Sequence, residues 1–502
     1  MLIRKTCVLL SFATKLEEWA AADYDFGVSL KITGASIRQT QLKTRMPFKY
    51  GIATMTKVPM VFVRVETTVD GRPSWGISSD LLPPKWFTKA PDDPLEREIA
   101  DMLRVIRRAL THAIGIEART AFAAWQGIYG QQEAWGKAEN IAPLLTHFGT
   151  SLVERALIES VCRATGQSLG QALRNDTLGF EPGAIHSVLA NRSAAEVLPQ
   201  KSLDKIVARH TVGLADPLST ASIPADELLD DSLPQSLDQC IRAYGLRHFK
   251  IKINGNLNAD HDRLRSVAAT IGENAPSDFA FSLDGNEQFK CVDDFRNHWE
   301  SLAANAELNS FFEHLLFIEQ PLHRDIALAD SVGDGFCDWP DRPSIIIDES
   351  DATIKSLPLA LELGYAGTSH KNCKGIFKGA ANACLLNARR KAGQAAVMSG
   401  EDLCNVGPVA VIQDLAVMSA LGIESVERNG HHYMAGLSQF PETTQRQVLV
   451  THAGLYRKSD QGWPTLDIRD GQINLRSVND QPFGTGFELD LSPFEEIGLT
   501  AA

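Results

Sequence analysis

From about residue 185 onward, short apolar segments alternate with segments of helical periodicity, at intervals of roughly 20 to 35 residues. Strands alternating with helices in this way run parallel, and eight such units close a (β/α)8 barrel. The eight predicted strands are AIHSVLA, HFKIKI, FAFSLDG, LLFIEQP, SIIIDES, AGTSHK, AAVMSG and a run near SALGIESVE. An open doubly wound sheet is the alternative fold, but the chain shows no GxGxxG loop to support it.

The chain before the barrel follows a different pattern. Residues 28–70 alternate like strands, and Asp70-Gly71 predicts a hairpin turn. Residues 75–87, which contain two prolines, predict a loop, and 94–116 and 150–173 predict helices. For the second helix, Thr150 or Ser151 is the predicted N-cap, with Glu154 completing a capping box. These segments form a predicted α+β module, and after the barrel WPTLDIRDGQINL and GFELDL predict short strands.

Three of the predicted barrel strands end in an acid. These are Asp284 in FAFSLDGN, Glu319 in LLFIEQP and Asp348 in SIIIDES. A single acid after a strand is often a helix cap or turn former, but three in the same phase on successive units indicate a site. Their carboxylates would repel one another without a cation between them. Oxygen ligands and open positions favour Mg²⁺, with Mn²⁺ as a substitute.

Lysines flank these acids along the chain. Lys250 and Lys252 lie two residues apart on the strand before Asp284, so they share one face, and Lys371 ends the strand after Asp348. A lysine becomes a base when its pKa falls, and burial beside other positive charge lowers it. A base beside a metal-bound carboxylate can remove the proton alpha to that carboxylate, giving an enediolate that the metal stabilises.

Taken in order, these motifs resemble the enolase superfamily, in particular its mandelate racemase and muconate lactonizing enzyme branch. The resemblance covers roughly residues 30 to 490. KIKING is similar to the family's K-x-K strand, SLDGNEQF to its D-x-N strand, FIEQPLHRD to its E-Q-P strand and IIIDES to its D-E-S strand. SHKNCKGIFKGA is similar to its K-x-x-K strand, and PFGTGFELD to its C-terminal tail, although GIFKGA replaces the usual Gly-Gly.

The resemblance implies roles for these residues and a division of the chain. The implied metal ligands are Asp284, Glu319 and Asp348, with Asn286 and Glu349 behind them. The implied acid/base lysines are Lys252 and Lys371, with Lys250 as an electrostatic helper. The predicted parts are an extension (1–27), an α+β capping domain (28–180), the barrel (181–440) and a segment returning to the capping domain (441–502).

In this family two loops of the capping domain usually choose the substrate. Here they are 44–54 and 75–87. The candidate substrate contacts within them are Arg45, Lys49, Lys85 and Trp86. Relative to the family the chain carries extra length at 1–27, 205–240, 331–343 and 441–465, so no specific substrate carries over.

The predicted reaction is open within one class. The seventh predicted strand, AAVMSGEDL, lacks the histidine of a mandelate-racemase-type site, and His370 points away by alternation, which favours the two-lysine branch. Two opposed lysines suit a racemase, an epimerase or a cycloisomerase acting on a small carboxylate. The alternatives are a dehydratase or lyase that eliminates water, and a barrel that keeps the fold without catalysis. A phosphoryl-transfer barrel is less favoured, because no phosphate-binding glycine loop is evident.

Charge and composition limit the partners. The net charge of -13 and the absence of a basic cluster argue against nucleic acid, and no apolar run approaches the roughly 20 residues of a membrane span. The basic and apolar start MLIRKTCVLLSFATKLEEW is interrupted by polar residues and lacks a prompt cleavage site, which argues against export. The eight cysteines form no CxxC pair. We predict a cytoplasmic protein and, from the family resemblance, a homo-oligomer.

Overall fold

The computed structural model describes residues 28–50 and 52–499. The predicted N-terminal extension over 1–27 and the argument against an export signal concern residues outside this part. Within the described part, no helix combines the length and apolar character needed to cross a bilayer.

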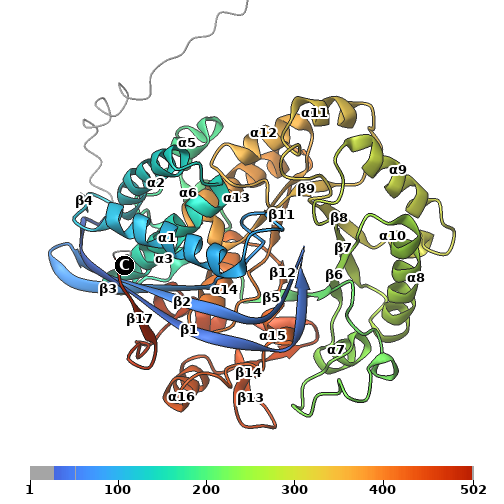
Figure 1. Cartoon of the computed structure of the whole chain (residues 1–502). Coiled ribbons are helices and arrows are strands. Elements are labelled where there is room, and N and C mark those ends of the chain that lie inside the picture. The colour runs from blue at the N-terminus through green and yellow to red at the C-terminus, as the bar shows by residue number, and fades with distance from the viewer. Residues whose placement is uncertain (1–27, 51, 500–502) are drawn as a thin grey trace, which may run out of the picture.

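Eight parallel strands form a closed barrel, which confirms the predicted fold class (Figure 1). Each strand pairs with the next in chain order, and the last pairs with the first. The strands are β5 (Lys205–Val212), β6 (His248–Lys252), β7 (Ala280–Asp284), β8 (Leu315–Glu319), β9 (Ile345–Ile347), β10 (Gly367–His370), β11 (Val397–Gly400) and β12 (Ser425–Glu427). Their residues are mostly buried, as expected for parallel strands covered by helices.

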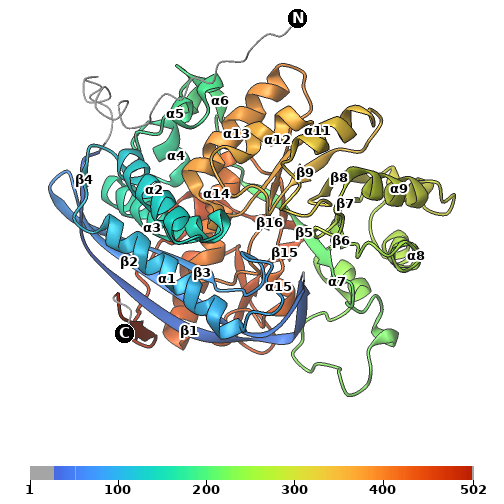
Figure 2. The ribbon, with the colours of Figure 1, turned by 45° about the horizontal axis from the view of Figure 1, so that its top comes forward.

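Helices follow the strands and surround the barrel (Figure 2). They are α7 (Leu237–Tyr244), α8 (Leu257–Asn274), α9 (Val292–Ala303), α10 (Asn309–Phe312), α11 (Asp330–Cys337), α12 (Ser356–Leu363), α13 (Ile376–Lys391) and α14 (Ala410–Leu421). Several end at a left-handed glycine, such as Gly245 after α7 and Gly422 after α14, a conformation that glycine adopts without steric cost.

The first barrel strand differs from the prediction. AIHSVLA forms α5 (Pro182–Ile185) and a 3-10 turn rather than a strand, and β5 is KIVARHTV. Pro182 starts a helical turn, since its fixed φ suits the first helical position. The true strand carries Arg209 and His210, both buried, and these polar residues conceal its apolar character in the sequence.

A second layer packs beside the barrel. Its antiparallel sheet holds three long strands, β1 (Leu30–Tyr50), β2 (Ala53–Val69) and β3 (Arg72–Leu81), and two short ones, β4 (Glu117–Ala118) and β17 (Glu495–Ile497), which pair with β1. Helices α1 (Leu95–Ala113), α2 (Ala121–Ala138) and α3 (Pro143–Thr165) accompany it (Figure 1). Because β17 lies near the end of the chain, the C-terminal segment returns to this sheet.

Local predictions in this layer succeed in part. The turn at Asp70-Gly71 is present, with φ of 47° and 74°, and helix 94–116 corresponds to α1. However, 75–81 is strand rather than loop, α2 was not predicted, and α3 begins at Pro143. The predicted caps Thr150 and Ser151 are therefore wrong, because both lie inside a buried helix.

The remaining elements precede the first barrel strand or follow the last one. They are α4 (Leu169–Arg174), α6 (Ala194–Val197), α15 (Gly430–Tyr433), α16 (Glu442–Thr451), α17 (Arg476–Asn479), β13 (Tyr456–Lys458), β14 (Pro464–Leu466), β15 (Ile468–Arg469) and β16 (Gln472–Asn474). WPTLDIRDGQINL thus forms short strands as predicted, and β16 pairs with β5. GFELDL forms none, so that prediction is wrong.

Candidate active site

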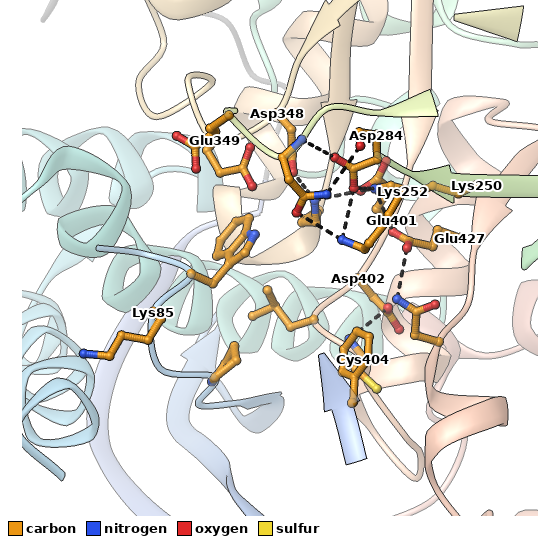
Figure 3. Close-up of a pocket in the computed structure, with 18 of the residues that line it drawn as sticks. Lys85, Lys250, Lys252, Asp284, Asp348, Glu349, Glu401, Asp402, Cys404 and Glu427 are labelled. Atoms are coloured by element: carbon orange, nitrogen blue, oxygen red, sulfur yellow. Dashed lines mark hydrogen bonds and ion pairs between the residues drawn. The ribbon is translucent and has the colours of Figure 1, made fainter. Parts of the chain in front are cut away.

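A cavity opens where the carboxyl ends of the barrel strands face the capping layer (Figure 3). Strand ends supply its polar floor, as this architecture dictates. The capping layer supplies an apolar wall, in which Phe48 and Met55 are paired residues of the β1–β2 hairpin and Trp86 follows β3. Both predicted specificity loops therefore reach the cavity.

The three predicted metal ligands lie on neighbouring strands at this mouth. Asp284 ends β7, Glu319 ends β8 in register with it, and Asp348 follows β9. All three are buried, with exposed fractions of 6%, 1% and 3%. Asn286 lies in the cavity wall, where its backbone N–H donates to Asp284 Oδ1 at 2.9 Å.

The predicted lysines point into the same group of acids. Lys252 Nζ lies 3.2 Å from Asp284 Oδ2 and 3.1 Å from Asn286 Oδ1. Lys371 Nζ lies 2.6 Å from Asp348 Oδ2. β6 and β10 are four strands apart in a ring of eight, so Lys252 and Lys371 approach the acids from opposite sides.

Lys250 lies deeper and contacts more acids. Its Nζ is 2.8 Å from Glu319 Oε1, 2.9 Å from Glu401 Oε2 and 3.3 Å from Glu427 Oε2. Burial alone would lower its pKa, but the surrounding carboxylates outweigh burial and raise the pKa well above its ordinary value. Lys250 is thus a fixed positive charge beneath the mouth.

Three charged residues that were not predicted from the sequence also lie in the site. Glu401 follows β11 and accepts from both Lys250 and Lys371, the latter at 2.8 Å. Glu427 ends β12, and Lys374 donates to Asp348 Oδ1 at 2.6 Å. Both acids carry the same signal as the predicted ones, an acid directly after a strand, so extending that rule to all eight strands would have found them.

Lys371 illustrates how the acids control the lysines. Burial alone would lower its pKa, but Asp348 and Glu401 attract the ammonium and raise the pKa well above its ordinary value. The lowered pKa predicted from sequence is therefore not a property of these side chains by themselves. It requires a further cation that neutralises the same carboxylates.

The acids themselves have room for such a cation. Carboxylate oxygens of Glu319, Asp348 and Glu401 lie within 4.8 Å of one another, and Glu319 Oε2 is buried without a hydrogen-bond partner in the described part of the chain. Burial and the adjacent Glu401 carboxylate raise the pKa of Glu319 well above its ordinary value. An all-oxygen set with an unpaired, buried acceptor fits a hard divalent ion. Asp284 lies just outside this closest group.

Glu349, predicted to lie behind the ligands, lines the cavity beside them (Figure 3). Burial first, and then the negative charges of Asp348 and Glu287, raise the pKa of Glu349 to about 8. Burial is thus the main reason that this carboxyl resists ionisation, and the neighbouring acids add to the effect.

The predicted substrate contacts separate into two groups. The ring of Trp86 lines the cavity, with its centroid 5.1 Å from Lys371 Nζ. Lys85 also borders the cavity, but its ammonium points away and lies 2.7 Å from Glu98 Oε1 and 2.6 Å from the Ala90 carbonyl oxygen (Figure 3). Trp86 is thus placed to contact a substrate, whereas the charge of Lys85 is used within the capping layer.

Arg45 and Lys49 do not border the cavity. Lys49 is exposed near the tip of the β1–β2 hairpin. The buried guanidinium of Arg45 donates to Asp231 Oδ1 at 2.8 Å and to the carbonyl oxygens of Pro234 at 3.1 Å and His432 at 3.0 Å. Arg45 therefore joins the hairpin to the segment after β5 and to α15.

We expect Arg45→Met to lower the free energy of unfolding by about 2 kcal/mol, because charge-assisted hydrogen bonds inside the protein are lost. Urea unfolding measures this loss. Lys49→Met, on the same hairpin, serves as the matched control and should leave unfolding unchanged. A variant of Arg45 that kept its stability but bound substrate poorly would instead support the predicted contact.

His370 faces away from the site, as alternation predicts. It is buried against α13, where a Cβ at Gly379 would lie 2.3 Å from the His370 ring. This close contact explains why position 379, the second glycine of GIFKGA, has no side chain. The His370 imidazole occupies the space behind the strand, while Lys371 faces the barrel mouth.

Comparison with known proteins gives the fold. No protein-family model matches the chain, and no curated protein matches it. Among solved structures, it resembles a muconate lactonizing enzyme from Pseudomonas fluorescens complexed with muconolactone, with a TM-score of 0.57 and 14% identity, covering 92% of this chain and 97% of that one. It also resembles a dipeptide epimerase from Cytophaga hutchinsonii complexed with Mg and D-Ala-L-Val, with a TM-score of 0.56, 14% identity and 93% and 99% coverage.

A third neighbour is an enolase from Bradyrhizobium complexed with magnesium and mandelic acid, with a TM-score of 0.54, 14% identity and 94% and 99% coverage. These chains are spanned almost completely. The barrel with its capping layer is therefore the fold of the mandelate racemase and muconate lactonizing enzyme group, as the motifs predict.

Proposed function

We propose that this chain is a Mg²⁺-dependent enzyme of the enolase superfamily that removes the alpha proton of a small carboxylate substrate. The observation that carries the proposal is the opposition of Lys252 and Lys371 across a group of buried strand-end carboxylates. An ion pair formed only for stability has no need of two lysines from opposite walls of a barrel. A reaction that handles a proton on two faces of one carbon does need them.

Asp284, Glu319 and Asp348 would hold the Mg²⁺ ion, with Glu401 close by. When bound, the ion would stabilise the negative charge that develops on the substrate carboxylate. Use of Mn²⁺ in its place stays a prediction.

The chain's own residues divide the remaining work. One of Lys252 and Lys371 takes the alpha proton, and the other either returns a proton to the opposite face or stabilises the enediolate by its charge. Lys250 keeps a fixed positive charge beneath them. Trp86 covers Lys371 and limits the access of water to the proton being transferred.

The cavity also indicates the kind of substrate. Phe48, Met55 and Trp86 form an apolar wall opposite the charged floor, so the substrate combines a carboxylate with an apolar portion. Neighbours of this fold have been solved with muconolactone, a dipeptide or mandelic acid, and we propose a small molecule of comparable size. Racemisation, epimerisation or cycloisomerisation is favoured, with elimination of water as the alternative outcome. The cytoplasmic location and homo-oligomeric state stay predictions.

Proton exchange in D₂O with Mg²⁺ tests the proposal. We expect deuterium at the alpha position of at least one compound in a panel of amino acids, N-acyl amino acids, dipeptides and sugar acids, followed by NMR. Exchange with inversion indicates a racemase or epimerase, and exchange with loss of water indicates a lyase. Calorimetric titration with Mg²⁺ is the companion measurement. A protein that neither binds Mg²⁺ nor exchanges any substrate would support the non-catalytic alternative.

A further inference from the structure

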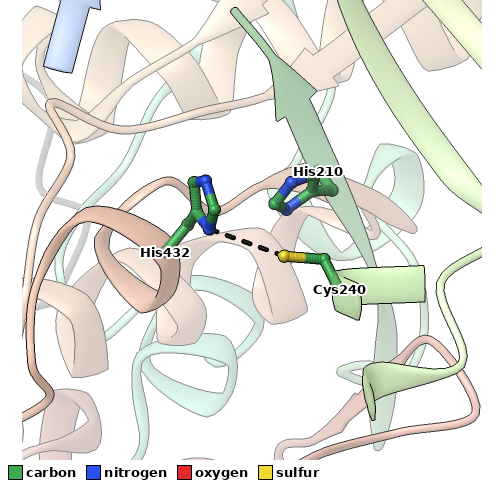
Figure 4. Close-up of side chains that lie close together, drawn as sticks. All are labelled: His210, Cys240 and His432. Carbon is green, nitrogen blue, oxygen red and sulfur yellow. Dashed lines mark hydrogen bonds between the residues drawn. The ribbon is translucent and has the colours of Figure 1, made fainter. Parts of the chain in front are cut away.

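A second group of candidate ligands lies outside the cavity. His210 on β5, Cys240 on α7 and His432 on α15 each direct one nitrogen or sulfur atom toward a common point (Figure 4). These three atoms lie within 4.8 Å of one another, and the residues are 3%, 0% and 2% exposed. Three elements distant in sequence thus converge on one buried site.

The barrel wall separates this group from the proposed active site. Arg209 and Thr211, on either side of His210, reach Glu401 and Glu427 inside the barrel. By strand alternation His210 faces outward, toward the helices. A ligand held here is consequently distinct from an ion at the barrel mouth.

The donors suit a different metal from the oxygen set. Two imidazoles and one thiolate are ligands for zinc, whereas Mg²⁺ prefers oxygen. Tetrahedral zinc with ordinary bond lengths separates its ligand atoms by about 3.3 to 3.6 Å. Cys240 Sγ and His432 Nδ1 lie 3.5 Å apart, which matches one edge of that tetrahedron.

Neighbouring side chains hold the two imidazoles in place. The rings of His210 and His432 pack edge to face, with their centroids 4.8 Å apart. His431 Nε2 lies 3.3 Å from His210 Nδ1, and this contact holds the His210 ring in its orientation. Because the thiolate is the form that binds zinc, binding of a metal to Cys240 releases the thiol proton to solvent.

We propose that His210, Cys240 and His432 supply three of the four ligands of one Zn²⁺ ion, with a buried water as the fourth, and that the ion fixes α15 against the barrel. Fixing α15 would also affect the wall of the active-site cavity. Tyr433, next to His432, stacks on Phe48 with ring centroids 4.1 Å apart, and Arg45 donates to the His432 carbonyl oxygen. The zinc site would thereby hold the part of α15 on which the β1–β2 hairpin rests.

Metal analysis of the full chain tests this proposal directly. The protein is expressed with added zinc and dialysed in excess Mg²⁺. Its zinc content per chain is then measured by elemental mass spectrometry. We expect about one zinc per chain in the wild type and in Asp348→Asn, and less than about 0.2 in Cys240→Ser and His432→Gln. Loss of zinc should also lower Tm by about 5 °C or more. Equal zinc in the wild type and Cys240→Ser, or none in the wild type, would overturn the assignment.

Cobalt titration of the zinc-free wild type keeps the test independent of whether the variants fold. A thiolate ligand produces an intense charge-transfer band in the near ultraviolet when Co²⁺ binds. We expect this band in the wild type and in Cys404→Ser, which removes the cysteine bordering the active-site cavity. Its absence from the wild type would show that the three residues are only a hydrogen-bonded cluster. Neither result depends on alpha-proton exchange, so failure here leaves the proposed function standing.

Discussion

Replacing Lys371 by alanine is expected to lower alpha-proton exchange by about a thousandfold or more on at least one face of the substrate. General acid–base groups contribute on the order of 10² to 10⁴ to a rate, and alanine leaves no other base at this position. The loss should appear in the turnover rate rather than in Mg²⁺ affinity, because Lys371 carries no ligand atom for a cation. NMR in D₂O and calorimetric titration with Mg²⁺ measure the two quantities separately.

Lys252→Ala completes this experiment, because the two lysines lie on opposite sides of the mouth. In a two-base isomerase each variant loses exchange from one stereoisomer and keeps it from the other. In a one-base enzyme a single variant loses exchange altogether. Lys85→Met is the matched control, since Lys85 borders the same cavity but its ammonium pairs with Glu98. Exchange that survives in both alanine variants, or is lost in the control, would contradict the assigned roles.

The barrel could be predicted because its strands carry a repeated local signal. Along the sequence, an apolar strand that ends in an acid or a lysine is repeatedly followed by a helix. Each of these features can be recognised from a short stretch of sequence alone. β5 escaped detection because Arg209 points into the barrel, where its guanidinium is held by Ser399 Oγ at 2.6 Å. A buried polar residue whose partners lie nearly 200 positions away looks like a surface residue in the sequence.

The same limitation explains the errors over Thr150 and Arg45. Thr150 has the residue type of a helix cap, but α3 continues past it because the helix is buried from Leu144 to Cys162, against β3 and the neighbouring helices. Arg45 lies in a predicted specificity loop, but its ion pair with Asp231 connects the capping layer to the segment after β5 of the barrel. The local sequence shows which residue type stands at a position and which face of its helix or strand it occupies. Its role depends on partners that lie far away in the sequence.

The proposed metal ligands are the reverse case, because the sequence selects the acids and the structure then shows which of them lie together. Replacing Glu319 by glutamine is expected to lower Mg²⁺ affinity by about a hundredfold or more and to abolish exchange. The substitution keeps side-chain shape and removes the charge. Since burial and Glu401 disfavour the ionised form of Glu319, the metal-free variant should be at least as stable to urea as the wild type. If Glu319→Gln instead lost activity because it unfolds, its urea unfolding midpoint would be lower than that of the wild type.

A pair of variants then decides the third ligand. Asp284 lies in register beside Glu319, and the resemblance assigns it to the metal, whereas the carboxylate oxygens that lie within 4.8 Å of one another belong to Glu319, Asp348 and Glu401. Glu401 pairs with three cations, Arg209, Lys250 and Lys371, so we expect it to position the lysines rather than to hold the metal. Asp284→Asn should therefore lose Mg²⁺ affinity as Glu319→Gln does, and Glu401→Gln should retain the affinity while exchange falls. The reverse order would move the ion toward β11 and make Glu401 its third ligand.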